Sequence, residues 1–436
     1  MITLGIRKSN LNGNTKIIGI TGTHGKTIVS SIISHILTKS NFKVATLTSQ
    51  GLAFSEEEIE PDITANSVQK SELKEIIKQV NAQDYDFLIL EITSKNIQRK
   101  TYPNIILDSG IITNIEGDTT HWKFWQEYAE TKVEFIKMIK ENGLLVVNGE
   151  GVDAVEWLRK NGDEIKNDIF CYWVNSSNLK DKALTLNSSK FRYYDNQIWE
   201  SKLIGHTSAL NLYLAIKVCT KYVEEWEIRK ALQSYRPIKG RFDRFYTNPF
   251  NIIIDYAKTP EQIEASLSFL HKNKNPNSKI ISVFGSHGGK WQSNRRAGEY
   301  LAKLSDIVLL APNDPNKEHT YDINSAIHSF AEPHGGRLIE RVFSNEETNM
   351  LRRDNLLNKM EQIKKHGEVP FISFDAHDYS GRLDAISFAL TLADEPDDIV
   401  YISGKGDESY LIFDGVEYEW SDYEAIRLAL ESLGLV

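Results

Sequence analysis

The segment from Lys16 to Leu37 constrains the fold of this chain more than any other. It begins with a short apolar run (Lys16–Thr21), continues with a glycine-containing turn, and ends with apolar residues at helical spacing. This order predicts a strand, a loop and a helix. The turn consists of Gly22, Thr23, His24, Gly25, Lys26 and Thr27. Backbone N–H groups and a helix N-terminus converge in such a loop, so it predicts a phosphate-binding site.

Two side chains of this loop strengthen the prediction. Lys26 adds a positive charge, and Thr27 adds a hydroxyl group suited to Mg²⁺. The spacing departs from a strict Walker A motif, because Ile20 stands at the position of its first glycine. A glycine turn with a solvated lysine is the alternative, but a strand before the loop and a helix after it favour phosphate binding.

The rest of the chain predicts two α/β domains. In the first, expected strands alternate with helical stretches, which is typical of a mostly parallel sheet: Lys43–Thr48, Phe87–Glu91, Gly110–Ile115 and Leu144–Asn148. Alternating residues from about 168 to 203 predict added antiparallel strands, and proline and glycine near 235–240 predict a linker. The second domain has strands expected at Asn251–Asp255, Lys279–Phe284, Asp306–Leu310, Val369–Phe374 and Asp398–Ser403, and a hairpin near 410–420.

We therefore expect a phosphate-binding P-loop domain at 1–237 and a Rossmann-like α/β domain at 238–436. A formal charge of -9 argues against a nucleic-acid partner. The first ten residues lack the apolar core of a signal peptide and no run is long enough to span a membrane, so a cytoplasmic protein without a membrane partner is expected. Two cysteines cannot form a four-thiolate zinc site.

The loop resembles the GTxGK[TS] motif of the Mur ligase family, and other segments resemble the family's later motifs in the same order. In the first domain these are Leu88–Ser94 (a strand ending in Glu-x-Ser-Ser), Thr113-Asn114, Tyr128 with Lys132, and Gly205 with Asn211. In the second they are Gly240-Arg241, Asp255–Pro260, Phe284-Gly285 with Arg295-Arg296, Asn313–Asn316 and Gly404–Glu408. The last three resemble the MurE branch most closely, and the resemblance covers nearly the whole chain.

This resemblance implies a ligase that uses ATP and Mg²⁺ to activate a carboxylate as an acyl phosphate and couples it to an amino acid, in peptidoglycan precursor synthesis. It implies small-molecule substrates. By the same resemblance, Lys26, Glu91 and a carbamylated Lys132 are catalytic. Metal ligands would be Thr27, Glu91, Lys132 and His121, and cofactor contacts would come from the loop, Asn114, Asn211, Arg241, Asp255 and Lys258. Substrate contacts would come from Arg295, Asp314, Asn316, Arg382 and Glu408, the acids holding an ammonium group.

Three departures from the family pattern qualify these expectations. The family's metal-binding histidine is missing after Asp118, and His121 is either its substitute or a surface histidine. Asn316 replaces an arginine that grips the distal carboxylate of diaminopimelate, so lysine or another amino acid without that carboxylate is expected. The chain begins shortly before the loop, so we expect the family's UDP-sugar-binding domain to be absent and supplied by a separate protein or domain.

Two alternatives stay open at this point. One is another ligase of the family, such as one that adds glutamate to a different carboxylate acceptor. The glycine-rich Gly-Gly-Arg-Leu-Asp segment of folate-polyglutamate ligases does not occur in the first domain, however. The other is a nucleotide-binding partner subunit without ligase activity, which the altered segment from Asp118 to His121 motivates.

Overall fold

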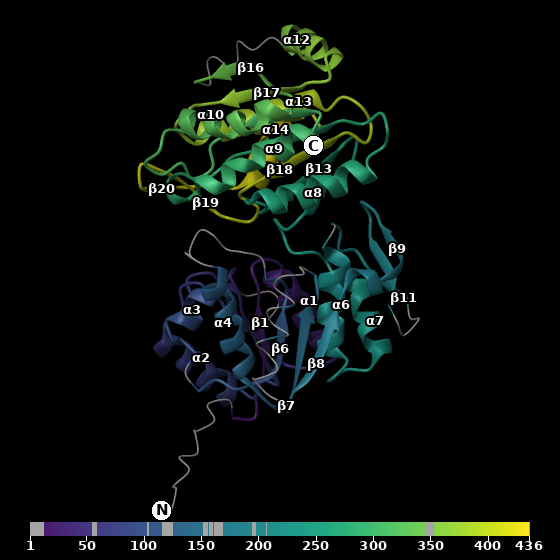
Figure 1. Cartoon of the computed structure of the whole chain (residues 1–436), viewed down its shortest axis with the longest axis vertical. Coiled ribbons are helices and arrows are strands. Elements are labelled where there is room, and N and C mark those ends of the chain that lie inside the picture. Colours follow the sequence, from purple (N-terminus) through teal and green to yellow (C-terminus); the bar gives the residue numbers. More distant parts are fainter. Residues whose placement is uncertain are drawn as a thin grey trace, which may run out of the picture. The chain divides into compact units, whose positions relative to one another are not determined.

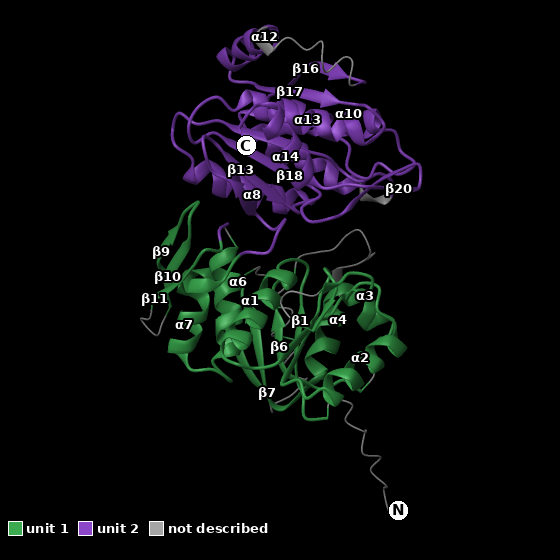
Figure 2. Ribbon diagram, turned by 180° about the vertical axis from the view of Figure 1, so that it is seen from behind, with its two compact units in different colours: residues 1–203, 207–236 green, residues 204–206, 237–436 purple. Residues whose placement is uncertain are grey.

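The computed structural model describes residues 13–54, 59–102, 104–115, 125–150, 156, 160, 169–193, 198–205, 207–344 and 353–435. The chain forms two compact units, coloured separately in Figure 2. The first comprises residues 1–203 and 207–236, and the second residues 204–206 and 237–436. The main division therefore falls inside the segment 235–240, which is rich in proline and glycine.

The first unit contains a mixed sheet of order β4-β3-β2-β5-β1-β6-β7-β8; Figure 1 labels β1, β6, β7 and β8 of this sheet. Its strands are β1 (Lys16–Thr21), β2 (Val44–Leu47), β3 (Leu52–Ala53), β4 (Ile59–Glu60), β5 (Phe87–Glu91), β6 (Leu107–Ile112), β7 (Ile139–Asn148) and β8 (Phe170–Val174). Neighbours are parallel except for the β2–β3 and β3–β4 pairs. A separate antiparallel sheet contains β9 (Lys180–Leu184), β10 (Ser189–Arg192) and β11 (Ile198–Ser201).

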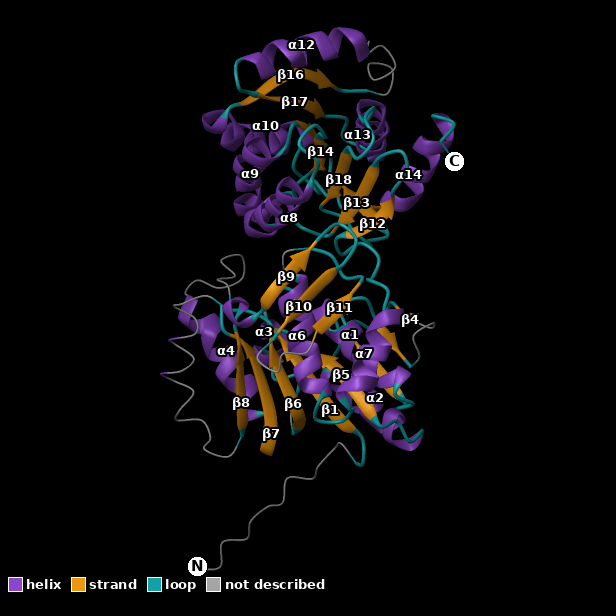
Figure 3. Ribbon diagram, turned by 90° about the vertical axis from the view of Figure 1, so that its right-hand side faces the viewer, coloured by secondary structure: helices purple, strands orange, loops and turns teal. Residues whose placement is uncertain are grey.

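Helices cover both faces of the larger sheet (Figure 3). The helices are α1 (Lys26–Lys39), α2 (Lys70–Ala82), α3 (Ser94–Gln98), α4 (Trp125–Lys137), α6 (Ser208–Cys219) and α7 (Glu225–Ser234), with the short turn η1 (Ser176–Asn178). One core packs α1, α6 and α7 against residues such as Ile18 and Ile20 of β1. The other packs α2 and α4 against Ile17 and the opposite faces of β5 and β6. The sheet is thus buried on both sides, as expected for parallel strands.

The second unit contains a sheet of order β12-β13-β18-β14-β15-β17-β16, parallel except for the β12–β13 pair. Its strands are β12 (Asp243–Tyr246), β13 (Asn251–Asp255), β14 (Ile280–Phe284), β15 (Ile307–Leu310), β16 (Gly336–Val342), β17 (Val369–Phe374) and β18 (Ile399–Ser403), followed by the hairpin β19 (Tyr410–Phe413) and β20 (Val416–Glu419). Its helices are α8 (Pro260–Asn273), η2 (Gly289–Arg296), α9 (Ala297–Leu304), α10 (Thr320–Ala331), η3 (Glu332–His334), α12 (Arg353–Lys365), α13 (Tyr379–Leu392) and α14 (Asp422–Ser432).

These observations confirm the predicted fold class, two α/β units with mostly parallel sheets. One local prediction was wrong: Phe170–Val174 pairs in parallel with β7 and extends the main sheet, whereas only β9 to β11 form antiparallel pairs. Strands β12 and β16 were not predicted. Within the described residues, no helix has both the length and the apolar character that a membrane crossing requires.

Candidate active site

The loop between β1 and α1 closes through two glycines in left-handed backbone conformations. Gly22 has φ 146° and Gly25 has φ 80°. A Cβ atom at Gly22 would lie 2.0 Å from Thr113 Oγ1, and one at Gly25 would lie 2.9 Å from Asn211 Oδ1. Side chains at these positions would therefore push the loop away from β6 and α6. Asn211, predicted to contact the cofactor, lies directly beside the loop.

Asn114 fixes the middle of the loop. Its side-chain Oδ1 accepts hydrogen bonds from the backbone N–H groups of Thr23 (2.7 Å) and His24 (3.0 Å). The Thr23 hydroxyl contacts the Tyr128 hydroxyl at 2.6 Å. Among the described residues no side chain caps the N-terminus of α1, and the N-terminus of a helix favours an anion. The arrangement fits a phosphate group.

Lys26 and Thr27 occupy the first turn of α1. The Lys26 ammonium folds over the loop and donates to the carbonyl oxygens of Gly22 (2.9 Å) and Thr23 (3.2 Å). The Thr27 hydroxyl lies 2.9 Å from the Ser49 hydroxyl, and the Ser49 N–H donates to Glu91 Oε2 at 3.3 Å. Ser49, which was not singled out from the sequence, thus links the hydroxyl and the carboxylate predicted to hold Mg²⁺. An oxygen pair of this kind fits a magnesium ion.

Lys132 is fully buried in the same unit. Its ammonium group donates to the hydroxyls of Thr21 (3.0 Å) and Ser94 (2.9 Å) and lies 4.6 Å from the centre of the Tyr128 ring. Thr21 ends β1, and Ser94 begins α3 shortly after Glu91, so Lys132 lies at the carboxyl edge of the sheet where α/β folds place ligands. His121, the other predicted metal ligand, lies outside the described residues.

In the second unit, Arg241 and Asp255 form contacts within that unit. Arg241 donates to Asp407 Oδ1 at 2.7 Å and stacks on Tyr256, 3.8 Å from the ring centre. Asp255 is buried, which raises its pKa, while donors partly offset this effect: the Ser266 hydroxyl, the Tyr401 hydroxyl and the Phe242 N–H. Asp255 therefore holds the segment that follows Arg241 in place.

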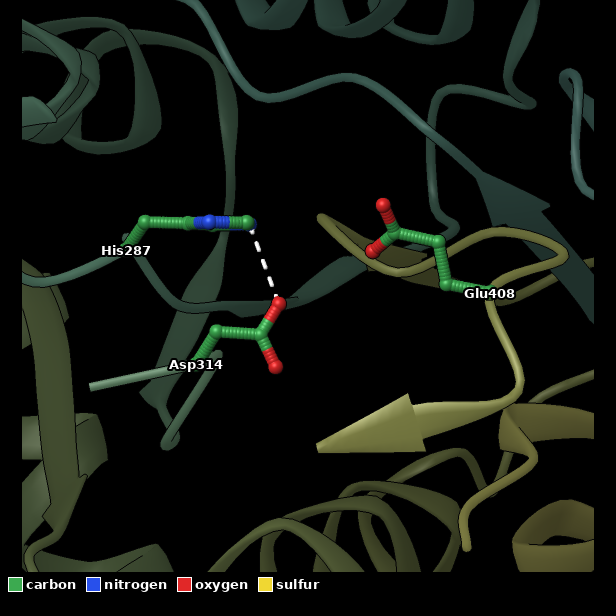
Figure 4. A group of neighbouring side chains, drawn as sticks. All are labelled: His287, Asp314 and Glu408. Carbon is green, nitrogen blue, oxygen red and sulfur yellow. Dashed lines mark ion pairs between the residues drawn. The ribbon is translucent and has the colours of Figure 1, made fainter. Parts of the chain in front are cut away.

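A cluster of charged side chains gathers at the carboxyl ends of β13, β14, β15 and β18. His287, Asp314 and Glu408 point toward one another, with ligand atoms all within 4.8 Å (Figure 4). Lys258 donates to Glu408 Oε1 at 2.8 Å, and Lys405 donates to both oxygens of Asp314 at 3.1 and 2.9 Å. The sequence predicted the two acids, but His287 and Lys405 were not singled out, because the contacts of both residues with Asp314 join segments that are distant in the sequence.

Burial and charge shift the pKa values of this cluster. Burial would raise the pKa of Glu408, but the ammonium groups of Lys258 and Lys405 hold it at about 2. Burial lowers the pKa of Lys258, and the charge of Glu408 opposes that effect. Burial, reinforced by Lys258, lowers the pKa of His287 to about 4. At neutral pH the imidazole of His287 is therefore neutral, and the carboxylate of Glu408 is ionised.

Two other predicted substrate residues lie near the end of β15. Arg295 is nearly buried and donates to Glu318 Oε2 at 2.6 Å. Asn316 is exposed, with φ 59°, and its backbone pairs with the hairpin through Ile412 and Asp414. Asn316 therefore occupies an accessible position, whereas Arg295 already has an acidic partner.

Arg382 does not occupy an open substrate site. Its side chain is completely buried, and its Nε and Nη2 atoms each donate at 2.8 Å to one carboxylate oxygen of Asp422. Nη2 also donates to the Ser403 carbonyl at 3.1 Å. A substrate carboxylate would have to displace Asp422, so we withdraw Arg382 from the expected substrate contacts and assign it a structural role between α13 and α14.

Comparison with known proteins places the chain in a family. The profile of the Mur ligase middle domain matches residues 20–219, and that of the Mur ligase, glutamate ligase domain matches residues 240–406. The chain belongs to the Mur ligase family. It is accordingly an ATP-dependent ligase that joins an acid to an amino acid.

Individual relatives are distant. UDP-N-acetylmuramoyl-L-alanyl-D-glutamate–2,6-diaminopimelate ligase of Buchnera aphidicola is 24% identical, over 97% of this chain and 77% of that protein. The enzyme of the same name from Caldanaerobacter subterraneus is 25% identical, over 96% and 79%.

Solved structures share the fold. A structure of a diaminopimelate ligase of the same name aligns with TM-score 0.62 and 19% identity, covering 98% of this chain and 80% of that one. Folylpolyglutamate synthase of Thermotoga maritima aligns with TM-score 0.59 and 18% identity, covering 91% and 87%. At these identities the likeness establishes the fold and leaves the substrate open.

The Arg382–Asp422 pair allows a test of a structural role. Removing one partner from a buried pair leaves an uncompensated charge and costs about 3–5 kcal/mol. We expect Arg382→Met to lower the free energy of unfolding by this amount in urea titrations. Arg427→Met, on the exposed face of α14, is the matched control and should change stability little. Unchanged stability of Arg382→Met, with a raised KM for the amino acid, would restore the substrate role.

The shifted pKa of His287 predicts a pH dependence of stability. Its pKa falls from 6.5 to about 4 in the folded chain, so folding favours the neutral ring. This contribution is present above pH 6.5 and is lost as the pH falls toward 4. Between pH 6.5 and pH 4, the free energy of unfolding of the wild type, measured by urea titration, should therefore fall by roughly 3 kcal/mol more than that of His287→Gln. His271→Gln, an exposed histidine on α8, is the control; a wild-type slope in His287→Gln would contradict the assignment.

Proposed function

We propose that this ligase acts in the synthesis of cell-wall peptide, adding an amino acid to a carboxylate of a peptidoglycan precursor. The main supporting observation is that several groups lie together at one edge of the first sheet. They are the phosphate loop with Lys26 and the hydrogen-bonded residues Thr27, Ser49 and Glu91. The second support is the distant relatedness to diaminopimelate ligases over nearly the whole chain.

The proposed reaction has two balanced steps. A carboxylate oxygen of the acceptor attacks the γ-phosphorus of ATP, the bond to the β-phosphate oxygen breaks, and ADP leaves. The amine of the amino acid then attacks the acyl carbon, phosphate leaves, and the amine loses a proton as the amide forms. Activation is needed because a carboxylate has no adequate leaving group.

Each side chain of the first unit has a proposed part in the phosphoryl transfer. The N-terminus of α1 and the ammonium group of Lys26 are proposed to neutralise phosphate oxygens, which places favourable charge where negative charge develops in the transition state. Thr27 and Glu91 would hold Mg²⁺, which supplies further charge neutralisation when bound. Asn211, beside Gly25, is proposed to contact the nucleotide, and Asn114 to fix the loop.

Five further residues have proposed roles. Lys132 is proposed to be carbamylated and to hold a second Mg²⁺, because a plain ammonium group would repel the ion. His121 is proposed as an additional ligand. In the second unit, Arg241 is proposed to contact the cofactor and Asp314, with Asn316, the incoming amino acid.

A product assay tests the proposed function. ATP and muramoyl-dipeptide acceptors would be offered with a panel of amino acids, and the products identified by mass. A folate acceptor with glutamate would form the second arm, since folylpolyglutamate synthase shares the fold. An amide product on the muramoyl acceptor is expected. A product on the folate acceptor alone would assign the chain to the polyglutamate-adding alternative, and ATP binding without any product would assign it to the partner-subunit alternative.

The phosphate loop predicts which variants lose ATP turnover. Lys26→Ala and Glu91→Gln each remove a charge next to the transferring phosphate, so ADP release should fall about a hundredfold or more. Circular dichroism and thermal unfolding should show a retained fold. Lys303→Ala, an exposed lysine paired with Glu299 on α9, is the control for loss of a positive charge. Near-normal turnover in either variant would remove the assignment of this site.

Carbamylation of Lys132 predicts chemical rescue. Lys132→Ala should lose most activity, and short-chain carboxylates such as acetate or propionate should restore part of it by supplying the missing anion. Chloride at equal ionic strength is the control. Absence of rescue, combined with an unmodified lysine by mass in a CO₂-equilibrated sample, would defeat this assignment.

A further inference from the structure

The acid pair of the second unit already has its own cations. Lys405 is completely buried and contacts both acids, donating to Asp314 and lying 3.0 Å from Glu408 Oε2. Lys258 donates to the other oxygen of Glu408 at 2.8 Å. His287, the third member of the cluster, has its Nε2 3.4 Å from Asp314 Oδ2 and is neutral at neutral pH. Two carboxylates thus face two ammonium groups, and the cluster has no net charge.

Lys258 is held in this position by more than the ion pair. Its ammonium lies 4.0 Å from the centre of the Tyr256 ring, and the Tyr256 hydroxyl donates to Glu408 Oε1 at 3.2 Å. Its backbone N–H donates to Gln262 Oε1 at 3.0 Å, in the capping box that begins α8. Only 14% of its side chain is exposed. Because both the ammonium group and the backbone of Lys258 are held, its positive charge stays beside Glu408.

We infer that Lys258 is the resident counter-ion of Glu408 and a specificity-determining residue, so that the incoming amino acid is one without a second ammonium group. A second ammonium would enter a cluster whose carboxylates are both compensated, and it would meet Lys258 and Lys405 as like charges. This inference rests on the proposed function for its substrate; among the amino acids expected from Asn316, which are lysine or another without a distal carboxylate, it favours those without a second ammonium group.

Chemical rescue in the purified protein tests the counter-ion role without any substrate. Lys258→Ala deletes the equivalent of n-propylammonium and leaves Glu408 with one cation fewer. We expect its thermal unfolding midpoint to fall, and millimolar n-propylammonium chloride to recover most of that loss. Neither n-propanol nor sodium chloride should do so. Wild type should not be stabilised by n-propylammonium, because the place is filled.

Two further variants make the result decisive. Lys258→Ala combined with Glu408→Gln should lose the response to n-propylammonium, because the charge that attracts it is gone. Lys303→Ala, which removes an exposed lysine from a surface pair, should show no response. Stabilisation of wild type by n-propylammonium, or equal responses of the single and double variants, would overturn the inference. If Lys258→Ala does not fold, Lys258→Met, which retains the apolar stem, replaces it and should show only a lowered midpoint that Glu408→Gln restores.

A competition assay then tests specificity. Norleucine and lysine have side chains of similar length, and only lysine has a second ammonium. Wild type should form mainly the norleucine product, and Lys258→Met should shift the product ratio at least tenfold toward lysine; the ratio does not depend on how much overall rate the variant loses. If neither amino acid gives a product while n-propylammonium still rescues Lys258→Ala, the result would contradict the proposed function and leave the counter-ion role of Lys258 supported. Predominant lysine product in wild type would overturn the inference.

Discussion

The close approach of the β1–α1 loop to the end of β6 is the constraint on which the first site depends. Gly22 passes so near Thr113 that a Cβ atom would overlap its hydroxyl, and the next residue, Asn114, accepts the loop's N–H groups. The loop geometry is thus set by β6 as well as by its own glycines. Parallel pairing of β1 with β5 and β6 brings Glu91 and Asn114 to the same edge as Lys26. The site follows from the strand order.

The second unit depends on a different principle, the pairing of buried charges. Arg382 with Asp422 and Lys405 with Asp314 are both nearly free of solvent. Taking such groups out of water is costly, and the cost is recovered only when each has a partner of good geometry. These pairs therefore fix the loops that follow β15 and β18 in one arrangement. The pairs also restrict the binding of a charged substrate group. Such a group would have to displace one partner of a pair, or it would be buried without a counter-charge.

The sequence predicted the fold well where local signals were strong. Phe87–Glu91 and Asn251–Asp255 agree with the observed strands to the residue, because continuous β-rich apolar runs mark buried parallel strands. Gly336–Val342 was missed because it lies at the sheet edge and contains charged residues that hide the periodicity. Phe170–Val174 was assigned to the wrong kind of pairing, since alternation within a strand does not specify its partner.

The candidate sites show the same division between local and distant information. The phosphate loop is readable because its function lies in consecutive backbone groups and one lysine, all within the same few residues. The acidic partners of Arg382 and Lys258 are 40 and 150 positions away in the sequence. The sequence therefore showed that both residues are charged but did not show which groups they contact. Glu408 belongs to a segment that resembles a family motif, but one of its ionic partners, Lys258, lies in a distant segment. In this chain the phosphate loop was visible as a motif, whereas the cations that surround the two acids could be identified only from the structure.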